Sequence, residues 1–133
     1  MAELEHIRPA ELSNHPAYTH VVAGRGARHV YVSGQVAIDG GGTPVGVGDL
    51  AAQTEQVMEN LATALAAAGA TFDDVVKITT FVVDYTPEMR SVIGDVRGRY
   101  LPADNPPAST LVGVSALAAP EWLIEIEAIA ITD

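Results

Sequence analysis

The sequence contains no cysteine and few basic residues. The absence of cysteine excludes disulfides, thiolate metal ligands and a thiol nucleophile. Seven Lys and Arg residues stand against seventeen Asp and Glu residues, which gives a formal net charge of −10. Because phosphate backbones are bound by clustered Lys and Arg, nucleic acid is not an expected partner.

Long apolar runs are also missing. No stretch approaches the roughly 20 residues that a membrane span needs, so no membrane partner is expected. The beginning, MAELEHIRPAEL, has two early acids and no apolar core of a signal peptide, which favours a cytoplasmic protein. The four histidines form neither H-x-x-x-H nor H-x-E, and no P-loop or G-x-G-x-x-G occurs. We therefore expect no metal and no cofactor.

The chain has 133 residues, of which 48% are hydrophobic and only 18% charged. This length favours a single domain over residues 1–133. So low a charged fraction is expected where much surface is buried between subunits, so we predict an oligomer. The alternative is an alanine- and glycine-rich composition typical of a GC-rich genome.

Local patterns predict five strands and two helices. Thr19–Ala23 and Arg28–Val36 are β-rich runs around the turn signal GRGA, which predicts a hairpin. Asp49 as N-cap and an apolar stripe before Gly69 predict the first helix. Thr86 as cap and Pro87 in the first position predict the second. The remaining predicted strands are Val75–Asp84, Ser109–Leu117 and Trp122–Ile131.

The element order β-β-α-β-α-β-β predicts an α/β (α+β) fold, a mixed sheet with two helices on one face. The last strand, WLIEIEAIAI, carries Glu125 and Glu127 among apolar residues. Since residues two apart share a face, Ile124 and Ile126 should face the helices and both acids the uncovered side. Either a partner subunit covers the acids there, or they mark a solvent-facing strand on which charge discourages aggregation.

Three blocks of the chain resemble the RidA family, also called YjgF/UK-type or endoribonuclease L-PSP. They are YVSGQVAID (Tyr31–Asp39), the helix-and-strand stretch Gln53–Asp84, and PPASTLVGV (Pro106–Val114) followed by IEIEAIA (Ile124–Ala130). The resemblance implies a chorismate-mutase-like fold assembled as a homotrimer, whose bare sheet faces form an internal barrel with small-molecule clefts between subunits. It also implies hydrolysis of reactive enamines and imines to a keto acid and ammonia.

The chain departs from this family at two positions. The family's P-A-R arginine, which pairs with a substrate carboxylate, is replaced here by Ser109 within Pro107-Ala108-Ser109. An asparagine typical of the second helix is replaced by Ile93 or a neighbour. Because both changes remove polar substrate contacts, we expect the standard 2-imino acid deaminase activity to be low.

Six residues are candidates for the site. By the match, Glu125 is the cleft acid that would direct the attacking water, and Glu127 would mainly hold structure. Tyr18 matches a tyrosine of the family and would line the cleft, or serve as an ordinary interface residue. His20, on the same strand face, would act as acid or base, or be structural.

Ser33 and Gly34 would approach the ligand through the backbone, or form a bulge. Ser109 would donate one hydrogen bond but cannot neutralise a carboxylate. We expect the remaining cations of the second helix to be solvated and not to replace the missing arginine: Arg90, Arg97 and Arg99.

Two functions remain open. One is a hydrolase for a small imine, enamine or related metabolite; the alternative is a protein that binds a metabolite in the same cleft without chemistry. Ammonia or keto acid release from 2-aminoacrylate made in situ separates them. A ribonuclease, the third possibility, conflicts with the acidic charge.

The charge gives a first prediction. With −10 per chain, the purified protein should show neither salt-sensitive RNA binding nor RNA cleavage in gel-shift and cleavage assays at low salt. Cleavage that survives extensive purification and disappears in Glu125→Ala would contradict it.

Overall fold

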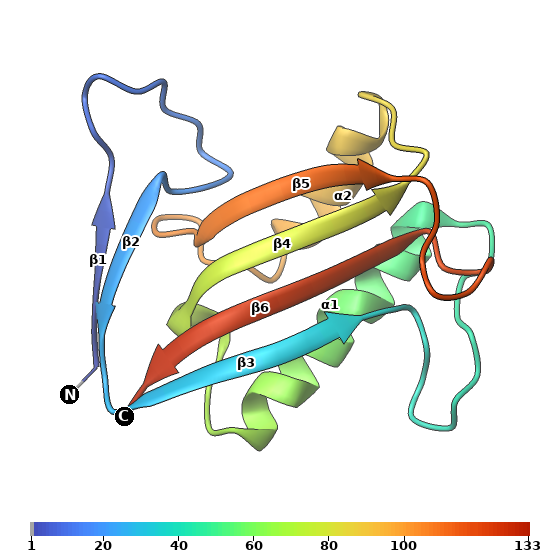
Figure 1. The fold of residues 1–133 in the computed structure, drawn as a ribbon, viewed down its shortest axis with the longest axis horizontal. Helices are drawn as coiled ribbons and strands as arrows, with labels where there is room; N and C mark the ends of the chain where they lie inside the picture. The colour runs from blue at the N-terminus through green and yellow to red at the C-terminus, as the bar shows by residue number, and fades with distance from the viewer. Residues whose placement is uncertain (1) are drawn as a thin grey trace.

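The computed structural model describes residues 2–133. It shows a mixed β-sheet with two α-helices packed behind it and a separate two-stranded ribbon at one end (Figure 1). This is the predicted fold class. The strands are β1 Glu3–Ile7, β2 Val21–Arg25, β3 Arg28–Gln35, β4 Val75–Val83, β5 Ala108–Val114 and β6 Ile124–Thr132; the helices are α1 Leu50–Ala67, the short 3₁₀ turn η1 Phe72–Asp74 and α2 Met89–Arg97.

Strand β6 is central in the main sheet, whose order is β3-β6-β4-β5. It pairs antiparallel with β3 and β4, while β4 and β5 are parallel. Ile124, Ile126 and Ala128 of β6 are buried in one core with Met58 and Leu61 of α1. The predicted alternation along this strand is therefore confirmed.

The two helices start differently. The Asp49 side chain caps α1 by accepting from the Ala52 N–H, and Gly69 has a φ of 77°, as predicted for a helix end. Helix α2 does not start at Thr86 and Pro87 as predicted. Their carbonyls accept from the Met89 and Arg90 N–H groups in a preceding turn, and the helix begins at Met89 without a side-chain cap.

The predicted hairpin between β2 and β3 is wrong. Strand β2 pairs instead with β1, an N-terminal strand that the sequence did not predict, and β3 pairs with β6. The link between β2 and β3 contains Gly26, which lacks the positive φ that a tight hairpin turn requires. A Cβ at Gly26 would lie 2.7 Å from the Thr132 carbonyl, so the chain passes the end of β6 and changes sheet there.

In the described part of the chain, no helix covers the second face of the main sheet (Figure 1). Tyr31 of β3, which projects from this open face, is 72% exposed. Among residues 2–133, no helix combines the length and the apolar character needed to cross a bilayer.

Buried Gln53 connects α1 to the start of β6. Its amide nitrogen donates to the Gly46 and Glu121 carbonyls (3.2 and 2.8 Å), and its amide oxygen accepts from the Leu123 N–H (2.9 Å). The segment just before Glu125 is thus held by one side chain.

Replacing this side chain should destabilise the protein. Gln53→Met takes away the partner of the Glu121 carbonyl and the Leu123 N–H, whereas the Gly46 carbonyl still accepts from the Asp49 N–H. We expect the free energy of unfolding in urea to fall by about 2–3 kcal/mol. Gln56→Met, which removes only a bond to Asn60, is the control and should cost about 1 kcal/mol or less. Equal losses in the two variants would show that the Gln53 bonds are not special.

Candidate functional site

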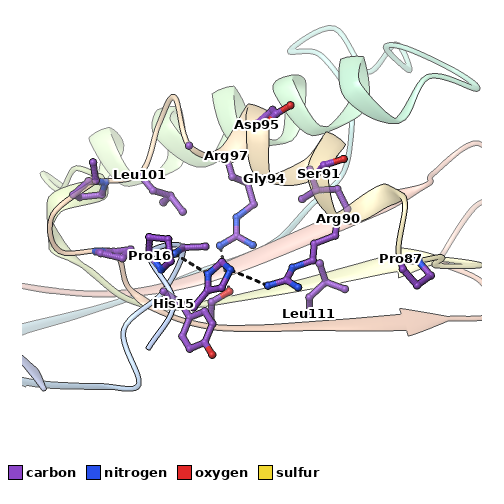
Figure 2. A pocket seen from close by; sticks show the side chains of 18 residues that line it. His15, Pro16, Pro87, Arg90, Ser91, Gly94, Asp95, Arg97, Leu101 and Leu111 are labelled. Atoms are coloured by element: carbon purple, nitrogen blue, oxygen red, sulfur yellow. Dashed lines mark hydrogen bonds between the residues drawn. The ribbon is translucent and has the colours of Figure 1, made fainter. Parts of the chain in front are cut away.

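A pocket of about 740 Å³ lies at the β5 edge of the sheet. Helix α2 forms one wall, strand β5 contributes the floor, and the segment from His15 to Tyr18 forms the opposite wall (Figure 2). Ser109 and Leu111 reach it from alternate positions of β5, on the face that the helices cover. Two of the six predicted site residues, Tyr18 and Ser109, therefore lie in one cavity.

The wall segment is held in place by Thr19. This buried hydroxyl donates to the Pro106 carbonyl at 2.5 Å, and the Thr19 N–H donates to the Pro107 carbonyl at 3.2 Å. Arg8 donates both to the Thr19 hydroxyl and to the Asp104 carbonyl. These bonds join the connection before β2 to the turn before β5, which brings Tyr18 to the pocket.

Arg97, the last residue of α2, extends into this pocket. Its Nη2 donates to the Ser109 hydroxyl at 3.2 Å. Its Nε is buried without a hydrogen-bond partner, and desolvation lowers the pKa of the guanidinium to about 10. At neutral pH the group remains cationic. The expectation that Arg97 is a solvated helix residue is wrong.

Arg90 and His15 meet at the rim of the same pocket. Arg90 Nη2 lies 3.2 Å from His15 Nε2, and the Ala17 N–H donates to His15 Nδ1 at 3.1 Å. The roles of the two nitrogens in the Arg90–His15 hydrogen bond depend on the tautomer of the ring. Arg90 and His15 therefore meet at the pocket rim without a negatively charged group between them.

The arginines have no carboxylate partner. Within residues 2–133, neither Arg90 nor Arg97 forms an ion pair, whereas the exposed Arg99 lies 3.4 Å from Glu55. Asp95 lies on the pocket border but points away from both guanidinium groups (Figure 2). The pocket thus carries positive charge in a strongly acidic chain.

Helical spacing holds the signal that could have identified Arg97. Arg90, Ile93 and Arg97 follow one another at intervals of three and four residues, which places them on one face of α2. Ile93 is 1% exposed and lines the pocket. Because Arg97 follows the core residue Ile93 by four positions, the sequence indicates that its side chain points inward.

Glu125 and Gly34 form a second group, away from this pocket. A Cβ at Gly34 would lie 2.7 Å from Glu125 Cδ and closer still to its Oε2, so the glycine leaves the space that the carboxylate fills. The register shifts by one residue between Val32 and Gln35, so Ser33 and Gly34 lie in a β-bulge. Within residues 2–133, the half-buried Glu125 carboxylate has no hydrogen-bond partner.

The two groups lie on opposite faces of the sheet. Ser109 is in register with the buried Ile78, on the helix side, whereas Glu125 is in register with Phe81, whose side chain points to the open side. Glu127, two residues after Glu125, is exposed on the open side. One chain alone therefore does not unite the predicted catalytic acid with the pocket.

His20 is occupied elsewhere. Its Nε2 lies 2.6 Å from the Ser13 carbonyl, and its ring meets Tyr18 edge-on with centroids 5.2 Å apart. It does not line the pocket. Among residues 2–133, no cluster of His, Asp and Glu could hold a metal ion.

Comparisons with known proteins extend over nearly the whole chain. The family model described as endoribonuclease L-PSP matches residues 9–132. Protein DfrA of Myxococcus xanthus is 38% identical over 115 residues, 86% of this chain and 85% of its own. A RutC family protein of Pyrococcus horikoshii is 37% identical over 101 residues, 76% of this chain and 77% of its own.

Solved structures agree with the sequence matches. The Rid-family protein YyfB of Yersinia pestis has 40% identity and a TM-score of 0.92, covering 96% of this chain and 98% of its own. TdcF of Escherichia coli, solved with bound serine, has 27% identity and a TM-score of 0.69, covering 79% and 81%. The chain belongs to the endoribonuclease L-PSP family, the RidA or YjgF family that its strand motifs resemble.

Proposed function

We propose that the protein is a cytoplasmic homotrimer that acts on a small reactive imine, enamine or related metabolite in a cleft between subunits. The observation that carries this proposal is the Glu125 carboxylate, which lies over the glycine of a β-bulge without a partner in residues 2–133. A carboxylate held in this way is free to take a proton from water. A relative of the same fold, TdcF, was solved with serine bound, which supports a small-metabolite ligand.

The proposed reaction is hydrolysis of a carbon–nitrogen double bond. Glu125 takes a proton from a water molecule while the water oxygen bonds to the imine carbon, and this proton passes to the nitrogen to give a carbinolamine. Glu125 then moves the hydroxyl proton to the amino nitrogen, and the carbon–nitrogen bond breaks to leave a carbonyl and ammonia. Ser33 and Gly34 position the carboxylate, and Tyr18 and Ser109 of a neighbouring subunit line the substrate side.

Two copies are needed because the candidate residues lie on opposite faces of one sheet. The open face next to Glu125 has no helix, and the exposed Tyr31 gives it an apolar surface to bury. A neighbouring copy that presents its β5 edge there would complete the cleft. His20 has a structural role in this proposal, because its Nε2 is already bonded to Ser13.

We expect low activity on the simplest 2-imino acids, such as 2-iminopropionate. With Ser109 on β5, the cation that reaches the pocket floor is Arg97, which comes from α2. A carboxylate placed for a strand-borne arginine is then displaced from its partner. A metabolite-binding protein without turnover is the alternative, and the pocket arginines, which have no carboxylate partner within residues 2–133, favour it equally.

The proposed homotrimer is tested by the molar mass of the protein in solution. Multi-angle light scattering should give about three times the chain mass of 13.9 kDa, because closing the open sheet faces requires further copies. A stable monomer at micromolar concentration would contradict the proposal.

The role of Glu125 is tested by turnover. On 2-aminoacrylate and other imines generated in situ, Glu125→Gln should lower kcat/KM by about 100-fold or more in an assay of ammonia release, because the amide cannot accept the proton. Glu127→Gln is the matched control and should stay within about 3-fold of wild type. Unchanged activity in Glu125→Gln, with the trimer intact, would remove the catalytic role. No turnover in any protein would leave the binding alternative.

A further inference from the structure

The strongest unexplained feature is positive charge without a counter-ion. Arg90 and Arg97 are two of seven basic residues in a chain of net charge −10, yet both lead into one pocket. Their nearest polar contacts within residues 2–133 are a serine hydroxyl and a histidine ring, neither of which carries negative charge. Shielded charges are normally paired, and the Arg97 Nε is buried without an acceptor within residues 2–133, which indicates that the missing partner is a ligand.

The two arginines reach different depths. Arg97 lies at the floor with Ser109, and its Nε is shielded from water without an acceptor. Arg90 is exposed at the rim with His15. The residues are seven apart on α2, so their Cα atoms are separated by roughly 10 Å along the axis. Arg97 contacts Ser109 at the floor while Arg90 contacts His15 at the rim, which gives the pocket two cationic contact points.

We infer that the pocket binds a small metabolite with two anionic groups, one paired with Arg97 at the floor and the other with Arg90 and His15 at the rim. Because Ser109 stands where the family has an arginine, β5 offers no cation to an anionic ligand. Arg97 of α2 supplies that cation instead. This inference rests on the proposed function, because for the same cleft it names the substrate class: the imine of a 2-oxo dicarboxylic acid.

The number and spacing of the anionic groups in a ligand distinguish this site from one that binds any anion. Dicarboxylates should bind more tightly than monocarboxylates of equal carbon number, because only the former engage both arginines. Each charge-assisted contact corresponds to roughly 10- to 150-fold in affinity. Inorganic phosphate, as a compact dianion, reaches only one arginine at a time and should bind no better than a monocarboxylate.

Calorimetric titration of the full chain at constant ionic strength tests the inference, with succinate, butyrate and inorganic phosphate as probes. We expect succinate to bind at least about 10-fold more tightly than butyrate. Arg97→Gln should weaken both carboxylates, and Arg90→Gln should remove only the advantage of succinate. Arg99→Gln, at an exposed arginine outside the pocket, is the control. Equal affinities for succinate and butyrate, tighter binding of phosphate, or an unchanged Arg97→Gln would overturn the inference.

A structural role for Arg97 gives a different result. If the cation is there for a ligand, Arg97→Met removes a desolvated charge, and the Tm without ligand should be at least that of wild type. A Tm several degrees lower, with unchanged succinate affinity in Arg97→Lys and Arg97→Gln, would assign Arg97 to the fold.

The titrations are repeated in Glu125→Gln, where the proposed chemistry is removed. Retained succinate binding there, with no turnover by any variant, refutes the proposed hydrolysis and keeps the anion site. Turnover that depends on Glu125 but not on Arg97 or Arg90 refutes the anion site and keeps the hydrolysis.

Discussion

The alternation of side chains along β6 is the constraint on which the rest of the structure depends. In a central strand, one set of residues must face the helices and the other must not. Ile124 and Ile126 complete the core against α1, and the same geometry forces Glu125 onto the face without helices. A shift of one residue in register would bury the acids and expose the core side chains. Core and candidate acid are therefore consequences of one strand pairing.

The amino-acid sequence was sufficient to predict β6, α1 and the side of each that is buried. Period-two and period-3.6 patterns report which side of an element is buried, and β6 and α1 follow them closely. The prediction of a hairpin between β2 and β3 was wrong because a turn signal does not determine which strands pair. The link at Gly26 passes the end of β6 and leads from one sheet to another. Strand β1, with Glu3 and Glu5 at its start, has too little apolar character to be read as a strand.

The candidate site was predicted less well, because its geometry depends on contacts between distant segments. Glu125 and Gly34 lie 91 positions apart, and their contact depends on the bulge in β3. Ser109 was interpreted as unable to neutralise a carboxylate, but attention to β5 alone overlooked a cation on α2. The spacing within α2 indicated the direction of the Arg97 side chain, whereas its partner Ser109 could be found only from the fold.

The anchoring of Thr19 has a consequence for the entropy of ligand binding. Thirteen residues separate Ile7 from Val21, long enough to be costly to order. Thr19 fixes this connection at its far end through two bonds to the turn before β5. Tyr18, next to the anchor, is therefore fixed, and the His15 ring stacks on it with centroids 5.7 Å apart. A ligand that contacts either ring meets a wall already in position, so its binding costs little conformational entropy there.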